Sequence, residues 1–167
     1  NGIVVTELGT KVSDKDRIEV NNEIIEKEKK EYYLLNKPRG VVTTTQDDKN
    51  RKTVVDLIPT NARIYPVGRL DYDTTGVLLL TNDGEFANIL MHPSNEVEKV
   101  YKATIDSILT TEEIYALKDG IVVDGIKVIP SRVKVKKKNM NKNTQVVEIG
   151  IVEGRNHIVK RIFEEMG

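Results

Sequence analysis

A compact polar loop that leads directly into a short apolar run is the feature that most constrains this chain. The loop spans Gly68–Gly76, and the apolar run Val77–Leu80 follows it without a break. This run is too short to cross a membrane, and the turn residues Asn82–Gly84 close it. Such a pattern predicts a fully buried β-strand, so we expect the polar loop to lie at the mouth of a core strand.

The loop contains one arginine and two aspartates, Arg69, Asp71 and Asp73. A carboxylate at the mouth of a rigid strand, two residues after an arginine, is held in place and kept ionised. A nucleophile or a metal ligand is presented in this way. Asp and Thr also hydrogen-bond their own backbone in loops, so an ordinary turn explains the same residues. Spacing alone leaves both interpretations open.

Composition narrows the classes of function. The chain has no cysteine, which excludes a disulfide framework, a thiol nucleophile and Cys-ligated metal sites. With only His92 and His157, a His-rich metal centre is disfavoured. The 167 residues, 38% of them hydrophobic, suit one domain or one domain plus a fragment of another. No signal peptide or membrane-spanning stretch is evident, so we expect a cytoplasmic protein.

The formal net charge of zero hides an asymmetry. Residues 1–126 contain 16 basic and 22 acidic side chains, whereas residues 127–167 contain 10 and 4. The basic excess peaks at Arg132–Lys138, where charged and apolar residues alternate as in a strand with one charged face. Such a face favours a phosphate backbone. For the lysines alone, a solvated strand edge protected from aggregation is the plainer interpretation.

The pattern along the chain predicts an α+β fold with a mainly antiparallel sheet, because strands outnumber helices and no regular βαβ alternation occurs. Residues 1–25 contain two short β-like pieces, at 1–5 and 17–22, and residues 26–31 are a mixed charge run that indicates a linker. The globular pattern occupies residues 32–167. We expect strands over 33–38, 41–44, 77–80, 97–105, 121–128, 131–138 and 144–152, and helices over 53–59, 83–91, 110–117 and 155–166.

Two interpretations of the polar loop involve a metal. As a calcium-binding loop starting at Asp71, it lacks suitable ligands at Thr75 and Asn82. The pattern Asp-x-Asp-x-Thr also resembles the first motif of haloacid-dehalogenase-like, magnesium-dependent phosphatases, with Asp71 as the nucleophile. The chain offers no convincing later acidic pair for the magnesium ion. This phosphatase interpretation is kept as an alternative function.

Several separated motifs, in order, resemble the RsuA/RluB branch of RNA pseudouridine synthases. They are Leu35–Gly40, Gly68–Asp71, Thr75–Gly84, Lys99–Tyr101 and Glu153–Arg161. Their number and order make the resemblance specific, although each alone would be weak. One departure is Ile158, where these enzymes usually have glutamine.

The resemblance implies a domain organisation. Residues 1–25 would be the C-terminal part of a small αL-type RNA-binding module, residues 26–31 a linker, and residues 32–167 a catalytic domain incomplete at its C-terminal end. The chain starts at Asn1 rather than Met, and we expect it to be part of a longer protein.

The resemblance also implies a reaction, the isomerisation of a uridine in ribosomal RNA to pseudouridine without a cofactor or a metal. Asp71 would be the nucleophile, Lys160 the basic residue of the active site, and Tyr101 the residue that packs on the base and assists removal of the proton from C5. The target uridine would be flipped out of its stack. Asp73 would shape the loop, and His157 would lie near RNA or face solvent. The residues expected to bind RNA are Arg69, Arg39, Lys37, Arg155, Asn156 and Arg161.

Residues 88–94 look closest to the RluB-like members of the branch, which favours a 23S over a 16S rRNA substrate. We expect ribosomal RNA as the partner of a monomeric protein. A non-catalytic RNA-binding factor for ribosome assembly is the remaining alternative, and it predicts RNA binding without base modification.

Overall fold

Strand β5 (Gly76–Thr81) follows the polar loop, as predicted, and is the central strand of the first sheet. It pairs antiparallel with β3 (Tyr32–Lys37) and β4 (Tyr65–Val67), in the order β3-β5-β4. Leu78 and Leu80 are buried in a small core, but Val77 is 72% exposed. The prediction of a fully buried strand is therefore wrong. The sheet is antiparallel, and Leu78 and Leu80 point to its covered face whereas Val77 points away from it.

A second antiparallel sheet has the order β6-β10-β9. Its strands are β6 (Lys99–Ile105), β10 (Thr144–Ile151) and β9 (Arg132–Asn139). The single strand expected over 121–128 is instead a hairpin of β7 (Ile121–Val123) and β8 (Ile126–Val128). Both residues of its turn, Asp124 and Gly125, have positive φ, which is typical of a tight two-residue hairpin turn. The two sheets and the helices confirm the predicted α+β class.

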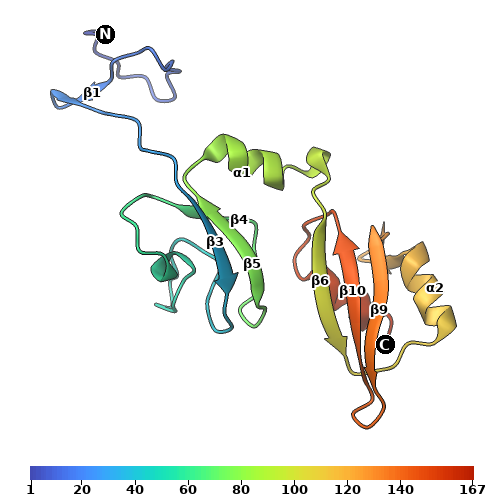
Figure 1. Ribbon diagram of the computed structural model, residues 1–167. Coiled ribbons are helices and arrows are strands. Elements are labelled where there is room, and N and C mark those ends of the chain that lie inside the picture. Colours follow the sequence, from blue (N-terminus) through green and yellow to red (C-terminus); the bar gives the residue numbers. More distant parts are fainter.

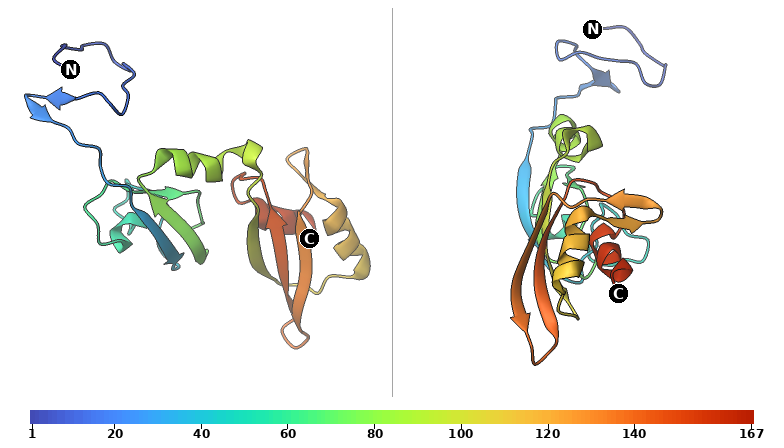
Figure 2. Two further views of the ribbon diagram at one scale, coloured as in Figure 1. Left: turned by 45° about the horizontal axis from the view of Figure 1, so that its top comes forward. Right: turned by 90° about the vertical axis from the view of Figure 1, so that its right-hand side faces the viewer.

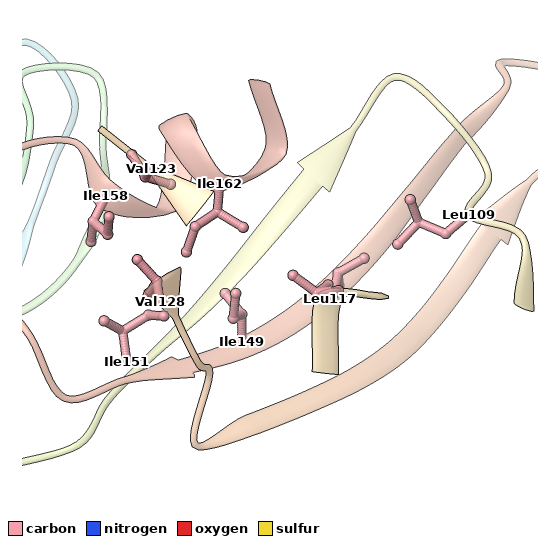
Figure 3. Close-up of a cluster of buried hydrophobic side chains, with 9 residues drawn as sticks. Leu109, Leu117, Val123, Val128, Ile149, Ile151, Ile158 and Ile162 are labelled. Carbon is pink, nitrogen blue, oxygen red and sulfur yellow. The ribbon is translucent and has the colours of Figure 1, made fainter. Parts of the chain in front are cut away.

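Helices α2 (Thr111–Asp119) and α3 (Ile158–Glu165) cover one face of the second sheet (Figures 1 and 2). The predicted capping box of α2 is present between Thr110 and Glu113. Helix α3 begins at Ile158 rather than at residue 155, because His157 has a left-handed backbone with a φ of 55°. The helices and the sheet enclose the larger core, most of which is labelled in Figure 3: Leu109, Leu117, Val123, Val128, Val147, Ile149, Ile151, Ile158 and Ile162.

Helix α1 (Gly84–Met91) and the 3-10 turn η2 (Pro93–Asn95) connect the first sheet to the second (Figure 2). The side chain of Asp83 caps α1 by accepting a hydrogen bond from the backbone N–H of Phe86. The helix expected over 53–59 is only a 3-10 turn, η1 (Val55–Leu57), and the strand expected over 41–44 is reduced to one parallel bridge, Val42 to Thr53. No helix has the length and apolar character needed to span a membrane.

The structure is a computed structural model and describes residues 1–167. Its N-terminal segment lies apart from both sheets (Figure 1). The only strands there are β1 (Glu19–Val20) and β2 (Glu23–Ile24), which form a small hairpin. The β-structure expected at residues 1–5 does not form.

Candidate active site

The polar loop between β4 and β5 is fixed by residues that lie far from it in the sequence. Lys37, at the end of β3, is fully buried, and its ammonium donates to the carbonyl oxygens of Asp71 and Thr74 at 2.9 Å each. It also donates to the carbonyl of Pro38 at 3.0 Å. Burial lowers the pKa of Lys37, and the charges of Asp73 and Asp71 oppose that shift. Lys37 therefore acts as an internal clamp on the loop.

Two further contacts complete the support of the loop. The hydroxyl of Thr43 donates to the carbonyl of Leu70 at 2.6 Å, and the N–H of Gly40 donates to the carbonyl of Tyr72 at 2.9 Å. The N–H of Thr74 donates to the carbonyl of Asp71 at 3.0 Å, which closes a turn around the carboxylate. The sequence left open whether this loop is an ordinary turn or part of a functional site. The structure shows a turn whose backbone carbonyls accept hydrogen bonds from Lys37, Thr43 and Gly40, which leaves the side chain of Asp71 free for other contacts.

The carboxylate of Asp71 contacts two side chains from the start of α3. Its Oδ2 lies 3.2 Å from Nζ of Lys160, and its Oδ1 lies 3.2 Å from Nε2 of His157. The side chain of Asp71 is 26% exposed, so it is partly screened from solvent but reachable. The predicted meeting of Asp71 and Lys160 therefore occurs between segments about 90 residues apart in the sequence.

Lys160 also binds Asp73, whose Oδ1 lies 2.9 Å from its Nζ. This hydrogen bond raises the pKa of Lys160 and lowers the pKa of Asp73. Asp73 has a 67% exposed side chain and is farther into solvent than Asp71. Its contact with Lys160 goes beyond the expected role in shaping the loop, because it fixes the position of the ammonium group between two carboxylates.

Tyr101 lies on the face of β6 that carries the core, opposite Ile149 of β10. Burial raises the pKa of its hydroxyl, and the negative charge of Asp71 raises it further. The charge of Asp71 therefore acts on the Tyr101 hydroxyl, although no hydrogen bond joins the two side chains. The structure thus gathers Asp71, Tyr101 and Lys160 from a loop, a strand and a helix into one site.

His157 is the site residue that sequence reasoning undervalued. It was expected near RNA or facing solvent, and it instead contacts Asp71 directly. The available signal was its spacing, because a residue three positions before Lys160 lies on the same side of a helix. The irregular start of α3 keeps the two side chains together although His157 itself is outside the helix.

The six residues expected to bind RNA fall into two groups. Arg39, Arg69 and Asn156 are exposed, and neither arginine forms an ion pair, so these three are available to a ligand. The others have partners inside the protein. Arg155 binds Glu153 at 2.7 Å and the carbonyl of Val123 at 2.9 Å.

Arg161 pairs with Asp124 in the turn of the β7–β8 hairpin. Arg155 and Arg161 therefore attach this hairpin to α3 and its approach loop, and the structure does not place them as free phosphate ligands. For Lys37 the prediction of an RNA contact needs correction. Its side chain is fully buried and its ammonium is used by backbone carbonyls, so it positions the loop instead.

The departure at Ile158 also has a structural explanation. Its side chain is 5% exposed and belongs to the larger core, where Figure 3 shows it beside the other aliphatic side chains. A core position favours isoleucine, because a buried glutamine needs hydrogen-bond partners. No group of three or more His, Cys, Asp or Glu side chains is placed to hold a metal ion.

The fold and the site define the class of this protein. The family model for RNA pseudouridylate synthases matches residues 31–165, and the chain belongs to that family, whose members are isomerases. It is 51% identical over 170 residues to "Ribosomal large subunit pseudouridine synthase B" of Bacillus subtilis, covering all of this chain and 69% of that protein. Membership of this family sets aside the phosphatase alternative.

Other relatives agree with this assignment. An uncharacterized RNA pseudouridine synthase of Aquifex aeolicus is 38% identical and is matched over 68% of its length. The dual-specificity RNA pseudouridine synthase RluF of Escherichia coli is 34% identical, over 96% of this chain and 54% of its own. A crystal structure of a pseudouridylate synthase superposes with a TM-score of 0.68 at 30% identity, over 98% of this chain and 70% of that one.

Proposed function

We propose that this protein isomerises a specific uridine of ribosomal RNA, within the large-subunit RNA, to pseudouridine, with Asp71 as the nucleophile. The observation that carries the proposal is the placement of the Asp71 carboxylate beside Lys160 and His157 at the end of a clamped loop. The substrate is inferred from the 51% identical relative, which is named for the large ribosomal subunit.

The reaction requires that the bond between N1 of the base and C1′ of the ribose breaks and that a bond between C5 and C1′ forms. The proton on C5 is lost and N1 gains one, so the overall composition is unchanged. In our proposal the carboxylate of Asp71 bonds to C1′ while the base turns, and it leaves as C5 bonds to C1′. An aspartate is ordinarily ionised at neutral pH, as a nucleophile must be.

Lys160 and Tyr101 have distinct proposed roles. Lys160 holds one oxygen of Asp71 and orients the carboxylate toward the ribose. The raised pKa of Tyr101 keeps its hydroxyl protonated at neutral pH. A neutral phenol suits packing against the base and hydrogen bonding, rather than proton abstraction in its resting form.

The remaining proposals concern RNA binding and context. The target uridine must leave its stack to reach Asp71, and Arg39, Arg69 and Asn156 are free to hold the flanking phosphates. We also propose that residues 1–25 end an αL-type RNA-binding module, that 26–31 are a linker, and that 32–167 form the catalytic domain. A monomer that needs no metal and acts on rRNA in the cytoplasm is consistent with this function.

The decisive test compares Asp71→Asn with Asp73→Asn, two isosteric changes at carboxylates that share Lys160. Pseudouridine is mapped in unmodified 23S rRNA transcript incubated with each purified variant. We expect Asp71→Asn to lose at least about a thousandfold in rate and Asp73→Asn to lose less than about tenfold. Substantial activity of folded Asp71→Asn would overturn the nucleophile. RNA binding without pseudouridine from the wild type would favour an assembly factor.

A further inference from the structure

The second sheet has a face that no helix covers, and it carries a row of charged side chains. Helices α2 and α3 pack on the opposite face (Figures 1 and 2). In the middle of the uncovered face, the strand register places Glu148 of β10 between Lys102 of β6 and Lys134 of β9. We call this the outer face of the second sheet.

Two more cations complete the cluster on the outer face. Arg132 and Lys136 lie two residues on either side of Lys134, and therefore on the same face of β9. Nη1 of Arg132 lies 3.6 Å from Oε1 of Glu148, and Nζ of Lys136 lies 3.4 Å from Oε2. Arg132 also lies 3.5 Å from Oε2 of Glu98 at the end of the sheet.

The two carboxylates do not neutralise this cluster. Burial acts to raise the pKa of Glu148, but its hydrogen bond to Lys136 and the charges of Arg132 and Lys134 outweigh that effect and lower it, so the group is ionised. Glu148 and Glu98 together oppose four cations. Lys102 and Lys134 form no ion pair and are exposed, so the positive excess lies in the middle row of the face.

This excess has an energetic consequence. Alternate residues of a strand are about 6.6 Å apart, so Arg132, Lys134 and Lys136 repel one another along β9. One partly buried carboxylate relieves only part of this repulsion. A bound polyanion would relieve the rest, and a row of exposed cations across three strands suits an extended phosphate backbone better than a small anion.

We propose that the outer face of the second sheet binds the phosphate backbone of a segment of the RNA substrate that lies outside the target nucleotide. The proposal rests on the proposed function for the identity of the RNA. Lys102 and Tyr101 are adjacent in β6 and point to opposite faces. The outer face is thus behind the active site, and an RNA that fills both must pass around an edge of the sheet.

This geometry predicts a dependence on RNA length. A short stem-loop that carries the target uridine occupies only the side of Asp71, whereas a long transcript also reaches Lys102 and Lys134. Contacts to phosphates carry no sequence information, so the outer face adds affinity without changing which uridine is modified.

The test uses the full-length protein with Lys102→Gln/Lys134→Gln. The matched control is Lys118→Gln/Lys127→Gln, which removes the same charge from exposed lysines of α2 and β8. Binding to an unmodified 23S rRNA transcript and to a short stem-loop containing the modified uridine is measured over a range of salt concentrations. Pseudouridine formation in the stem-loop and thermal unfolding are measured in parallel.

We expect the outer-face variant to lower the salt slope for the long transcript by about two, and its affinity at 0.1 M salt by up to about tenfold for each lysine. Stem-loop turnover and unfolding temperature should be unchanged, or the latter raised by relieved repulsion. Equal salt slopes for the outer-face and control variants would overturn the proposal. A fall in unfolding temperature with an unchanged slope would also overturn it, because it would assign the lysines to structure alone.

The two proposals fail separately. If the wild type makes no pseudouridine in any transcript, the proposed function is lost, while a reduced salt slope would still establish the outer face as an RNA-binding surface. If pseudouridine forms and the slope does not change, only the outer face is rejected. Binding of a second protein copy in place of RNA would show as a concentration-dependent dimer that the double variant abolishes, and it too would overturn the proposal.

Discussion

Nε2 of His157 lies 3.2 Å from Oδ1 of Asp71, on the oxygen that Lys160 does not contact. Both oxygens of the carboxylate are therefore engaged in the free protein. A bond from one of these oxygens to a ribose would weaken the contact at that oxygen, because the oxygen would then carry less negative charge. Lys160 is held by two carboxylates, whereas His157 has only this contact and a 47% exposed side chain. His157 is the partner that can move away, and until then it orients the carboxylate.

The first prediction follows from this contact. His157→Ala leaves Asp71 with one partner, and we expect kcat/KM for pseudouridine formation to fall by up to about fivefold, because a contact between exposed charged groups contributes at most about 1 kcal/mol. His157→Gln, which can still donate, should retain most of the activity. The control is His92→Ala, because His92 bonds only Ser94 in the η2 turn. Full activity of His157→Ala would show that the contact has no role in turnover.

The second prediction concerns the clamp on the catalytic loop. Lys37→Met leaves the partly buried carbonyls of Asp71, Thr74 and Pro38 without their donor, so we expect a loss of about 2 kcal/mol in the free energy of unfolding. Chemical denaturation measures it, and Lys49→Met, at an exposed loop lysine, is the control.

If Lys37 instead bound RNA, the variant would unfold like the wild type and lose affinity for RNA. That outcome would restore the role that the sequence suggested for it. Loss of stability with unchanged RNA affinity per folded molecule would support the clamp.

The sequence predicted most of the elements that hold the site. The strands at β3, β5, β6, β9 and β10 lie where alternation and turn residues placed them, because these patterns report local burial. Long-range packing was harder to predict from the sequence. Nothing local to Lys37 shows that its ammonium serves a loop more than 30 residues away, so a lysine beside a proline looked like a surface phosphate ligand. The one-sided burial of β5 had the same cause, since it depends on what covers each face of the sheet.

For the candidate site, too, local patterns were informative and long-range contacts were not. The motif residues Asp71 and Lys160 are in contact in the structure, because each motif carries one side chain in a fixed local context, and their catalytic roles stay predictions. The partners of Arg155 and Arg161 lie in the β7–β8 hairpin, and the sequence analysis predicted a single strand over 121–128 instead of this hairpin. Charge alone could not distinguish an arginine that anchors a hairpin from one that is available to bind a phosphate.

The third prediction concerns Tyr101. Its raised pKa keeps the hydroxyl neutral, so we expect Tyr101→Phe to preserve RNA affinity, with the ring packed on the base as proposed, and to lower kcat by about tenfold through loss of a hydrogen bond from the hydroxyl. The pH profile of the wild type should show no Tyr101 ionisation below about pH 10. Tyr115→Phe, at a 67% exposed tyrosine of α2, is the matched control. Loss of affinity without loss of kcat would limit Tyr101 to binding.

The last prediction is a pH dependence of stability at the cap of α1, which joins the two sheets. Asp83 accepts hydrogen bonds from the hydroxyl of Tyr32 at 2.5 Å and from the N–H of Phe86 at 3.2 Å, and it pairs with Lys30 at 3.0 Å. The hydrogen bond from Tyr32, with those from Lys30 and Phe86, lowers the pKa of Asp83 to about 2. The carboxylate is therefore more acidic in the folded than in the unfolded chain, where its pKa is about 3.9.

A group with a lowered folded-state pKa stabilises the protein above its unfolded pKa, and this contribution is lost as the pH falls toward the folded value. We expect the unfolding temperature of the wild type to fall between about pH 4 and pH 2. The unfolding temperature of Asp83→Asn should be lower than that of the wild type at pH 7 and should decrease less over that interval. Asp119→Asn, at an exposed pair with Lys127, should follow the wild-type curve closely. Thermal unfolding followed by circular dichroism at successive pH values measures all three curves. Parallel curves for the wild type and Asp83→Asn would show that this carboxylate does not govern the acid stability of α1.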